Sequence, residues 1–476
     1  MRNIICNLLL FLIISNSTIA QEKWDLRKCV DYALTNNINI KQTDIQAKIA
    51  AVNYQQNKQS LYPSLNFSGG PSFNNGRNQD PVSFSLITQS FVSANMQLQT
   101  SAQIFNWYSK KNSILASQWQ VEAAKASTDK LKNDIALIIA NAYLQILLAK
   151  EQEKIAAVQL QQTQSQLGNT RKLVDAGSLP ELNAAELEAQ VARDSSSLVI
   201  AMGNVEQALL SLKANMNLDA ATNMEIDVPP VAMIPIEKIG DLQTETVYAL
   251  AIANLPQQRV NEFNLKAARK NAESARGSMY PTIGAFGSIS SGYNSRSSEI
   301  IGSSQVNAPV GKVTVNGTEY SVFPNQPFTN YNYGKTSFGN QLNVNFRQSV
   351  GISISVPIFN GGSLRSNWER SKYNIKTAEL QQDADNQKIK QDIYQAYNAA
   401  VVAFQKFNAS GKVVETSQRS FEFAKKRYDV GMLSTFELIT NQNNLFRAKL
   451  ENILNQFDYV FKMKVLEFYK GQGLKL

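Results

Sequence analysis

Histidine is absent from this chain of 476 residues, and cysteine occurs only twice, at Cys6 and Cys29. The lack of histidine removes Ser-His-Asp and Cys-His catalysis, HExxH metalloprotease motifs and histidine-rich metal cages. We expect Cys6 to be removed with a leader segment. The one cysteine left then makes neither an intramolecular disulfide nor a thiolate zinc site, and a small buried apolar role suits it best. These shortages predict a protein that is not an enzyme and that holds no metal and no cofactor.

Clusters of like charge are missing as well. The net charge is +9, from 47 Lys and Arg against 38 Asp and Glu. The basic residues stand singly among Gln, Asn and Ser, without a basic run or a basic-aromatic cluster. Nucleic acid is therefore not an expected partner.

No stretch beyond residue 20 is apolar enough for us to expect a membrane-spanning helix. Residues 1–20 have the pattern of a secretory signal peptide: Arg2, an apolar core over Ile4–Ile14, and a small-x-small cleavage site at Thr18-Ile19-Ala20. No cysteine follows that site for a lipid anchor. An exported chain without a spanning helix is either soluble or a β-barrel.

Much of the remaining chain is present twice. SAQIFN at Ser101–Asn106 matches SVPIFN at Ser355–Asn360, and DAG at Asp175–Gly177 matches DVG at Asp429–Gly431. The matched residue numbers differ by 254 throughout, over some ninety residues. A constant spacing of this length indicates a duplicated structural unit.

Between these paired motifs, each copy has about 67 residues without proline, rich in helix-forming Ala, Gln, Lys and Leu. Small apolar residues recur there at alternating steps of four and three, the narrow seam of a coiled coil. In the first copy these are Ile135, Ile139, Ala142, Ile146 and Ala149, and in the second they include Ile389, Ile393, Ala396, Ala400 and Ala403. At 1.5 Å per residue, each helix would be roughly 100 Å long.

The pattern predicts two repeats joined by an irregular, proline-containing linker over 218–243. The first repeat, 21–217, has expected helices over 24–62, strands over 64–74 and 90–105, and long helices over 107–174 and 181–216. The second, 244–476, has expected helices over 244–279, strands over 281–293 and 341–359, and long helices over 362–428 and 435–470. Gly/Ser/Asn-rich loops are expected over 71–84 and 294–339, and the second repeat has 36 extra residues in its loop.

The predicted strands alternate apolar with small polar residues. The apolar members are Val92, Ala94, Met96, Leu98, Ala102 and Ile104 in one strand, and Val350, Ile352, Ile354, Val356 and Ile358 in another. Such strands separate two different solvents. The apolar face packs on a core in a soluble protein, and faces lipid in an outer-membrane barrel.

Four strands per chain do not close a barrel alone, and an open edge in lipid leaves backbone groups unpaired. Two chains supply eight strands and three supply twelve, so the hypothesis of a membrane barrel requires an oligomer. The expected fold class is mainly α with a membrane β-barrel portion.

The combined pattern strongly resembles the TolC-type outer-membrane efflux protein family over nearly the whole mature chain. The resemblance depends on the repeat, on SVPIFNGG over Ser355–Gly362, and on the helix-tip motifs VDAGSLPELN over Val174–Asn183 and YDVGMLSTFEL over Tyr428–Leu438. It implies a homotrimer with a twelve-stranded barrel in outer-membrane lipid and a long periplasmic α-helical coiled-coil barrel. The implied function is a passive exit duct of a tripartite efflux pump or type I secretion system, served by a periplasmic adaptor and an inner-membrane pump of RND, ABC or MFS type.

The resemblance also implies a gate at the periplasmic tip, built of acidic rings and a tyrosine-arginine-acid latch. Carried over by position, the upper acid is Glu437 and the tyrosine is Tyr428. The second acid is replaced by Thr440, the arginine by Leu433 and the latch acid by Asn183. A latch in this chain must therefore use different chemistry, and Glu437 can also serve simply as an acid at a helix start.

The duplicated turns before the last helix of each repeat are candidate adaptor contacts. Their residues are Gly177, Ser178, Leu179 and Pro180 in the first repeat, and Gly431, Met432, Leu433 and Ser434 in the second. Three chains would present six such turns, a number suited to a hexameric adaptor of the membrane-fusion type.

Two other classes of function stay open. A trimeric coiled-coil surface or structural protein would place the alternating strands in a soluble sheet, although the repeated strand-helix order argues against one-directional heptads. A hydrolase would have to rely on scattered acids. The exported cargo, whether drugs, metal ions or polypeptides, has no signature in the sequence.

Overall fold

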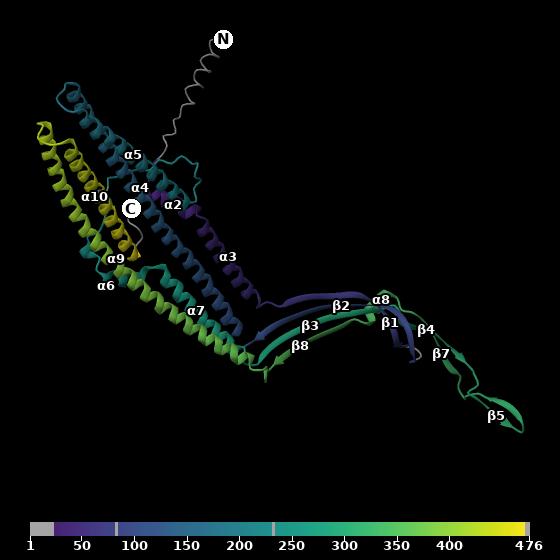
Figure 1. Cartoon of the computed structure of the whole chain (residues 1–476). Helices are drawn as coiled ribbons and strands as arrows, with labels where there is room; N and C mark the ends of the chain where they lie inside the picture. The colour runs from purple at the N-terminus through teal and green to yellow at the C-terminus, as the bar shows by residue number, and fades with distance from the viewer. Residues whose placement is uncertain (1–22, 81–83, 231–233, 472–476) are drawn as a thin grey trace, which may run out of the picture. The chain divides into compact units, whose positions relative to one another are not determined.

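The computed structural model describes residues 23–80, 84–230 and 234–471. The signal peptide expected over 1–20, with Cys6, lies outside the described residues. The chain divides into two compact units (Figure 1). One comprises Met1–Tyr54, Ala116–Arg269 and Tyr373–Leu476, and the other Gln55–Leu115 and Lys270–Lys372. The first unit is helical, and the second contains every β-strand of the described chain.

The helices follow the same order in both repeats. Each repeat has two shorter helices, one helix of 67 residues and one of about 35 residues. They are α2 (Leu26–Asn36), α3 (Ile38–Gln59), α4 (Ser109–Asp175) and α5 (Glu181–Met216), then α6 (Thr244–Asn254), α7 (Pro256–Gly277), α9 (Ser363–Asp429) and α10 (Thr435–Tyr469). The repeat in the sequence is therefore a repeat of structure.

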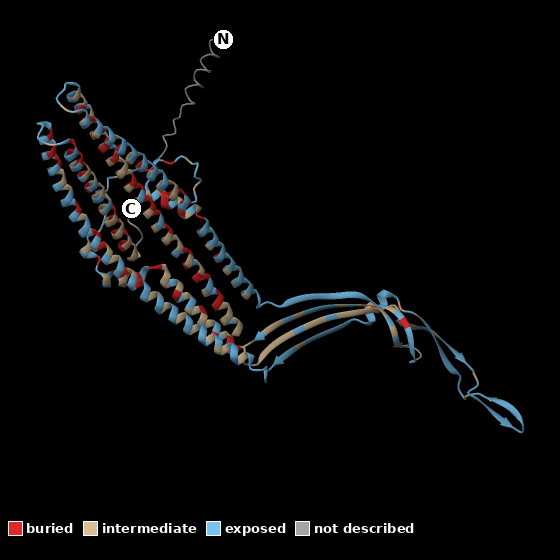
Figure 2. Ribbon diagram, viewed as in Figure 1, coloured by how far each residue is buried: buried red, intermediate tan, exposed pale blue. Residues whose placement is uncertain are grey.

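The largest apolar core of the helical unit is centred on α4. Ile139 and Ile146 of the predicted seam are fully buried there, and the core joins α4 to α2, α5 and α10. Figure 2 shows the buried residues as stripes along the helices. Cys29 lies in this core, and its burial, with Asp25 nearby, raises the pKa of its thiol to about 12. The interpretation of Cys29 as a small buried residue is thus confirmed.

One expectation about α4 is wrong. An 18-residue window of this helix has a mean hydropathy of 1.3 and meets the length and composition criteria for a membrane span, although we expected no such stretch. In that window, 44 % of the residues are buried inside the protein. Several residues of α4 belong to the largest apolar core of the helical unit.

The second unit contains a four-stranded antiparallel sheet in the order β1-β2-β3-β8. Its strands are β1 (Ser64–Gln79), β2 (Leu86–Phe105), β3 (Thr282–Asn294) and β8 (Arg347–Ser355). Neighbouring strands lie side by side in Figure 1. The central pair, β2 and β3, joins the two repeats, with Leu98 opposite Ile289.

The loops of this unit are more regular than the sequence predicts. Strand β1 continues to Gln79, well into the loop expected over 71–84. The loop expected over 294–339 contains β4 (Ser298–Val306), β5 (Gly311–Val315), β6 (Thr318–Val322) and β7 (Phe328–Lys335), paired as β4-β7 and β5-β6. Helix α8 (Phe338–Val344) occupies the start of the strand expected over 341–359. We did not predict these strands, because they are short and lie in a stretch rich in Gly, Ser and Asn.

The linker between the repeats is irregular, as expected, but it is firmly attached to the helices. Its one described helical turn is η2 (Ile239–Asp241). Ile226 bridges to Trp24, and the hydroxyl of Tyr143 donates to the carbonyl of Asp227 at 2.6 Å. Further on, Lys464 of α10 donates to the carbonyl of Pro235.

The Lys464 ammonium is also paired with the carboxylate of Glu467 at 2.8 Å, and both side chains are at most 6 % exposed. Glu467 in turn accepts a hydrogen bond from the backbone amide of Glu237. Breaking a buried ion pair leaves one charge without a partner, which costs about 3–5 kcal/mol. The pair therefore couples the linker to α10.

We predict that Lys464→Met lowers the free energy of unfolding by about 3 kcal/mol, because Glu467 stays buried without its cation. Guanidinium unfolding followed by helical circular dichroism measures this. Lys462→Met removes a more exposed pair with Asp458 and should cost at most about 1 kcal/mol. Equal losses in the two variants would contradict the assignment.

Candidate functional site

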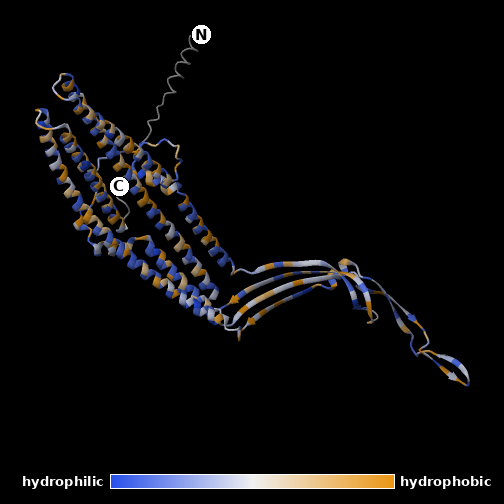
Figure 3. Ribbon diagram, viewed as in Figure 1, coloured by the Kyte–Doolittle hydropathy of each residue, from blue (hydrophilic) through white to orange (hydrophobic). Residues whose placement is uncertain are grey.

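The four-stranded sheet has one apolar and one polar face, as its register demands. The apolar face carries Leu65, Phe67, Phe73, Val92, Met96, Leu98, Ile283, Ile289, Val350, Ile352 and Ile354. The opposite face carries Asn66, Ser68, Ser72, Asn95, Gln97, Gln99, Ser288, Ser290, Ser349 and Ser353. Hydrophobic and hydrophilic residues alternate along these strands in Figure 3.

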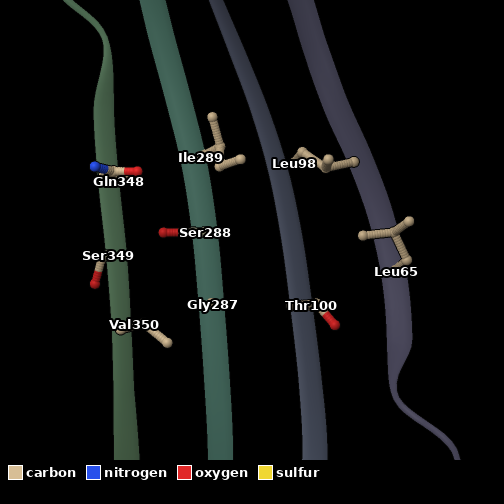
Figure 4. A pocket seen from close by; sticks show the side chains of 9 residues that line it. All are labelled: Leu65, Leu98, Thr100, Gly287, Ser288, Ile289, Gln348, Ser349 and Val350. Atoms are coloured by element: carbon tan, nitrogen blue, oxygen red, sulfur yellow. The ribbon is translucent and has the colours of Figure 1, made fainter.

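No element of the described chain covers the apolar face. Val350 is 89 % exposed and Ile352 is 71 % exposed. In Figure 4, Gly287 lies between Thr100 and Val350 of the neighbouring strands, and together with Leu65, Leu98 and Ile289 these residues line a shallow hollow. An exposed apolar surface of this extent is unfavourable in water, and so it belongs against an apolar medium.

The strand length matches a lipid bilayer. The 13 residues of β3 span about 43 Å at 3.3 Å per residue. With the usual tilt of about 45° for a membrane strand, this gives about 30 Å, the thickness of the hydrocarbon layer.

Aromatic side chains gather at both ends of β3. Near the start of β3, the ring of Trp107 packs on that of Tyr280, with centroids 5.1 Å apart, and on that of Phe105 at 5.4 Å. At the other end, Tyr293 packs on Phe338 at 5.3 Å. Trp107 is still 46 % exposed. Aromatic girdles on either side of an apolar band are the usual mark of membrane strands.

The edges of the sheet are unpaired within the described chain, because β1 and β8 each have a single neighbour. Each unpaired amide or carbonyl group in lipid costs several kcal/mol. A sheet that faces lipid therefore needs other strands along both edges.

The tips of the two helical hairpins are built in the same way. Gly177, two residues after the end of α4, has φ 72°, and Gly431, two residues after the end of α9, has φ 74°. The amides of Gly177 and Ser178 bond back to the carbonyls of Val174 and Leu173, both at 2.8 Å. Gly431 and Met432 repeat the two bonds with Tyr428 and Arg427. This Schellman geometry requires a left-handed residue, which glycine adopts without strain.

Glu437 takes part in a capping box at the start of α10. Its carboxylate accepts from the Ser434 hydroxyl at 2.8 Å and from the Ser434 amide at 3.1 Å, while the Ser434 hydroxyl accepts from the Glu437 amide at 3.2 Å. The hydrogen bonds from Ser434 lower the pKa of Glu437 below its ordinary value. The reading of Glu437 as a helix-start acid therefore describes its contacts here.

Tyr428 lies among buried residues. Its hydroxyl is 3.0 Å from that of Thr170 on α4 and 3.4 Å from that of Thr435. Its ring belongs to an apolar cluster against which Leu433 also packs. Its hydroxyl partner on the first hairpin is thus Thr170, and not Asn183, the position expected for the latch acid.

The other predicted gate residues are placed separately. The amide of half-buried Asn183 bonds to the carbonyl of Pro180 at 3.1 Å, and exposed Thr440 donates to the carbonyl of Phe436. Sequence reasoning missed an arginine near this end, Arg171 of α4, whose guanidinium bonds to Glu181 and Glu188 of α5.

It also missed a buried polar cluster made of Thr163, Gln190, Asp194, Gln442 and Asn443. One signal was available: Asp194 interrupts a buried helix face at a position where the second repeat has Ala448.

A model of known protein families matches residues 29–218 and 247–461, under the description outer membrane efflux protein. The chain belongs to this family. The match covers both repeats and leaves out most of the linker. The protein is accordingly an efflux protein of the outer membrane.

Curated relatives share modest identity over most of their length. The outer membrane efflux protein BepC of Brucella suis is 22 % identical over 395 residues, covering 82 % of this chain and 73 % of BepC. The toluene efflux pump outer membrane protein TtgC of Pseudomonas putida is 21 % identical over 443 residues, covering 89 % and 78 %.

Solved structures of outer-membrane channels have the same fold. CusC superposes with a TM-score of 0.75 at 16 % identity, covering 96 % of each chain. CmeC of Campylobacter jejuni gives 0.72 at 17 % identity, covering 94 % of this chain and 86 % of CmeC. These relatives are channels and not enzymes, and members of the family work with adaptors and inner-membrane pumps.

The capping box leads to a prediction about the tip. Ser434→Ala removes the side-chain acceptor of the Glu437 amide, and should weaken the start of α10 by about 1 kcal/mol. We expect faster hydrogen-deuterium exchange of the Glu437 and Leu438 amides, with no change in the sheet. Ser434→Thr keeps the hydroxyl and should exchange like the unaltered protein. Unchanged exchange in Ser434→Ala would contradict the role of the cap.

Proposed function

We propose that three copies of this chain form a twelve-stranded barrel in the outer membrane and a helical tunnel in the periplasm. This assembly is the passive exit duct of a tripartite efflux pump or a type I secretion system. The observation that carries the proposal is the four-stranded sheet with an uncovered apolar face and two unpaired edges.

Closure explains the choice of three copies. If β8 of one chain pairs with β1 of the next, each edge finds a partner and every backbone group is satisfied. Three chains of four strands give a barrel wide enough to leave an aqueous lumen lined by the Ser, Asn and Gln face. Eight strands from two chains leave an interior just wide enough for side chains.

The paired tips suit a periplasmic adaptor. Both Schellman turns expose small or apolar residues, among them Met432, which is 70 % exposed. Figure 1 shows the two tips at the same end of the helical unit. In a trimer six similar turns would face a hexameric adaptor, which would connect the duct to an inner-membrane pump.

The gate is proposed at the same end. Three copies of Glu437 around the axis would form a ring of negative charge, with Thr440 one turn further along the helix. The hydrogen bonds from Ser434 do not conflict with this role, because they hold the carboxylate in its charged form. Tyr428 and Asn183 remain the proposed neighbours of the ring.

The alternative of a trimeric coiled-coil surface protein is not favoured, since the related proteins and the similar solved structures are efflux channels. Names such as toluene efflux pump describe those relatives.

Assembly is the first test. Protein extracted from membranes in mild detergent should be a trimer in light scattering, and should give discrete conductance steps in planar bilayers. An internal deletion of β8 leaves β3 as an open edge. This control should give neither a trimer nor conductance steps. A monodisperse monomer with an intact β-signal in circular dichroism would contradict the proposal.

Charge selectivity is the second test. Glu437→Gln should lower cation selectivity in asymmetric KCl and weaken block by a trivalent cation, while Thr440→Asp should strengthen both by adding a second ring. Because the hydrogen bonds from Ser434 hold the pKa of Glu437 below its ordinary value, its carboxylate stays charged as pH falls from neutral. Wild-type selectivity should therefore persist to about pH 5 and decline below the ordinary pKa of a glutamate.

The carboxylate should be neutralised at a higher pH in Ser434→Ala, which lacks the hydroxyl hydrogen bond. Crowding of three like charges acts in the opposite direction to Ser434 and raises the pKa. An unchanged reversal potential in Glu437→Gln would leave Glu437 with its capping role alone.

A further inference from the structure

A buried hydrogen-bonded cluster joins the two helical hairpins a few turns from their tips. We call it the polar seam; it consists of Thr163 on α4, Gln190 and Asp194 on α5, and Gln442 and Asn443 on α10. Thr163, Asp194 and Gln442 are at most 5 % exposed. None of these residues belongs to the turns or the gate positions discussed above.

Two sets of hydrogen bonds in the seam cross from one repeat to the other. The Gln442 amide donates to the Thr163 hydroxyl at 2.8 Å. The Gln190 amide donates to the Asn443 carbonyl oxygen at 3.1 Å, and the Asn443 amide returns a longer bond of 3.4 Å. These bonds hold α10 against the first hairpin.

Asp194 holds the two side chains that bond to α10, those of Thr163 and Gln190. Its two carboxylate oxygens accept from the Thr163 hydroxyl at 2.6 Å and from the Gln190 amide at 2.7 Å. Because the Thr163 hydrogen is directed at Asp194, the hydroxyl oxygen is free to accept from Gln442. Asp194 is thus a positioning residue that acts through Thr163 and Gln190.

The duplication shows that the fold does not need this carboxylate. The residue that matches Asp194 in the second repeat is Ala448, which is equally buried at 5 % exposure. Thr170, the other hydroxyl that crosses between hairpins, matches the buried Ala424. An apolar residue at these two positions is therefore compatible with the coiled coil, so helix packing alone does not require Asp194 or Thr170.

Apolar packing between the repeats is concentrated elsewhere. The cluster nearest the tips is formed by Phe421, Ala424, Tyr428, Leu438 and Leu445, all from the second hairpin. The large core that joins both repeats includes Phe457 and Val460 of α10. Gln442 and Phe457 are separated by 15 residues, or about 22 Å of helix.

We propose that the polar seam is the latch that keeps the two hairpins of each chain together, with the core around Phe457 as the fixed point about which they part. This inference rests on the proposed channel and gate. Hydrogen bonds suit a reversible contact, since water replaces them when the hairpins separate, whereas apolar surface exposed to water has no such replacement.

The sharpest test replaces one hydroxyl by a methyl group of the same size. In the joined state, Thr163→Val leaves the Gln442 amide without its acceptor and Oδ2 of Asp194 without its donor, while Oδ1 keeps the Gln190 amide. Losing one such partner shifts an equilibrium by about tenfold. We expect the open fraction of single channels in planar bilayers to rise about tenfold, or more if three protomers act together, with little change in the thermal stability of the trimer.

The chain offers a matched control and a rescue. Thr128 lies on the same helix at 6 % exposure, and its hydroxyl donates to the carbonyl of Ala124 in its own helix. Thr128→Val should therefore leave the open fraction unchanged. Thr163→Ser keeps the hydroxyl and should restore the behaviour of the unaltered channel. A loss of packing alone would affect Thr163→Ser at least as much as Thr163→Val.

A combined variant tests whether the opening in Thr163→Val comes from the unpaired polar groups that it leaves. Replacing Thr163→Val, Asp194→Ala and Gln442→Leu together removes both sides of the broken bonds, which is often neutral or stabilising. Gln190 keeps Asn443 and Arg193 as partners. We expect this variant to open no more often than the unaltered channel.

An open fraction in Thr163→Val equal to that in Thr128→Val would overturn the latch and leave the channel intact. If Thr163→Val does not assemble, Asn443→Ala, at a half-buried position, tests the second crossing bond with the same readout. Absence of any conductance from the unaltered protein would instead overturn the proposed channel, and the latch with it.

Discussion

The constraint on which this structure depends is the hydrogen bonding of backbone groups at the edges of a sheet whose apolar face is uncovered. In the second unit β2 and β3 are paired on both sides, but β1 and β8 each leave one side open. A soluble sheet meets this problem with water, whereas a lipid-facing sheet has none. A single chain leaves its apolar face uncovered and its edge strands unpaired. The proposed trimer would pair these strands and place the face against lipid.

Much of the architecture was predictable because it follows from local patterns. The 67-residue helices follow from the lack of proline and from the seam through Ile139 and Ile146. The turns follow from Gly177 and Gly431, because glycine readily adopts the left-handed conformation found at both positions. The two faces of the sheet follow from alternation along β2 and β8, because side-chain direction in a strand depends only on position.

Other features were not predictable, since they depend on contacts between segments far apart in the chain. The hairpins within residues 298–335 are short and exposed on both faces, and α8 occupies the start of an expected strand. The attachment of the linker depends on Lys464, a residue on the far side of the second repeat. The polar seam joins residues up to 279 positions apart, and Asp194 alone had a signal, through its mismatch with Ala448.

The equal length of α4 and α9 has a consequence for how such a chain can change. Both helices have 67 residues, and their ends present the turns at the same end of the helical unit. Deleting seven residues from one helix alone would retract its tip by about 10 Å and leave the other in place. Lengthening or shortening must therefore occur in both copies at once, whereas the loop after β3 took up 36 residues in one copy only. The two tips stay level only while both helices keep the same length, so each helix constrains the length of the other.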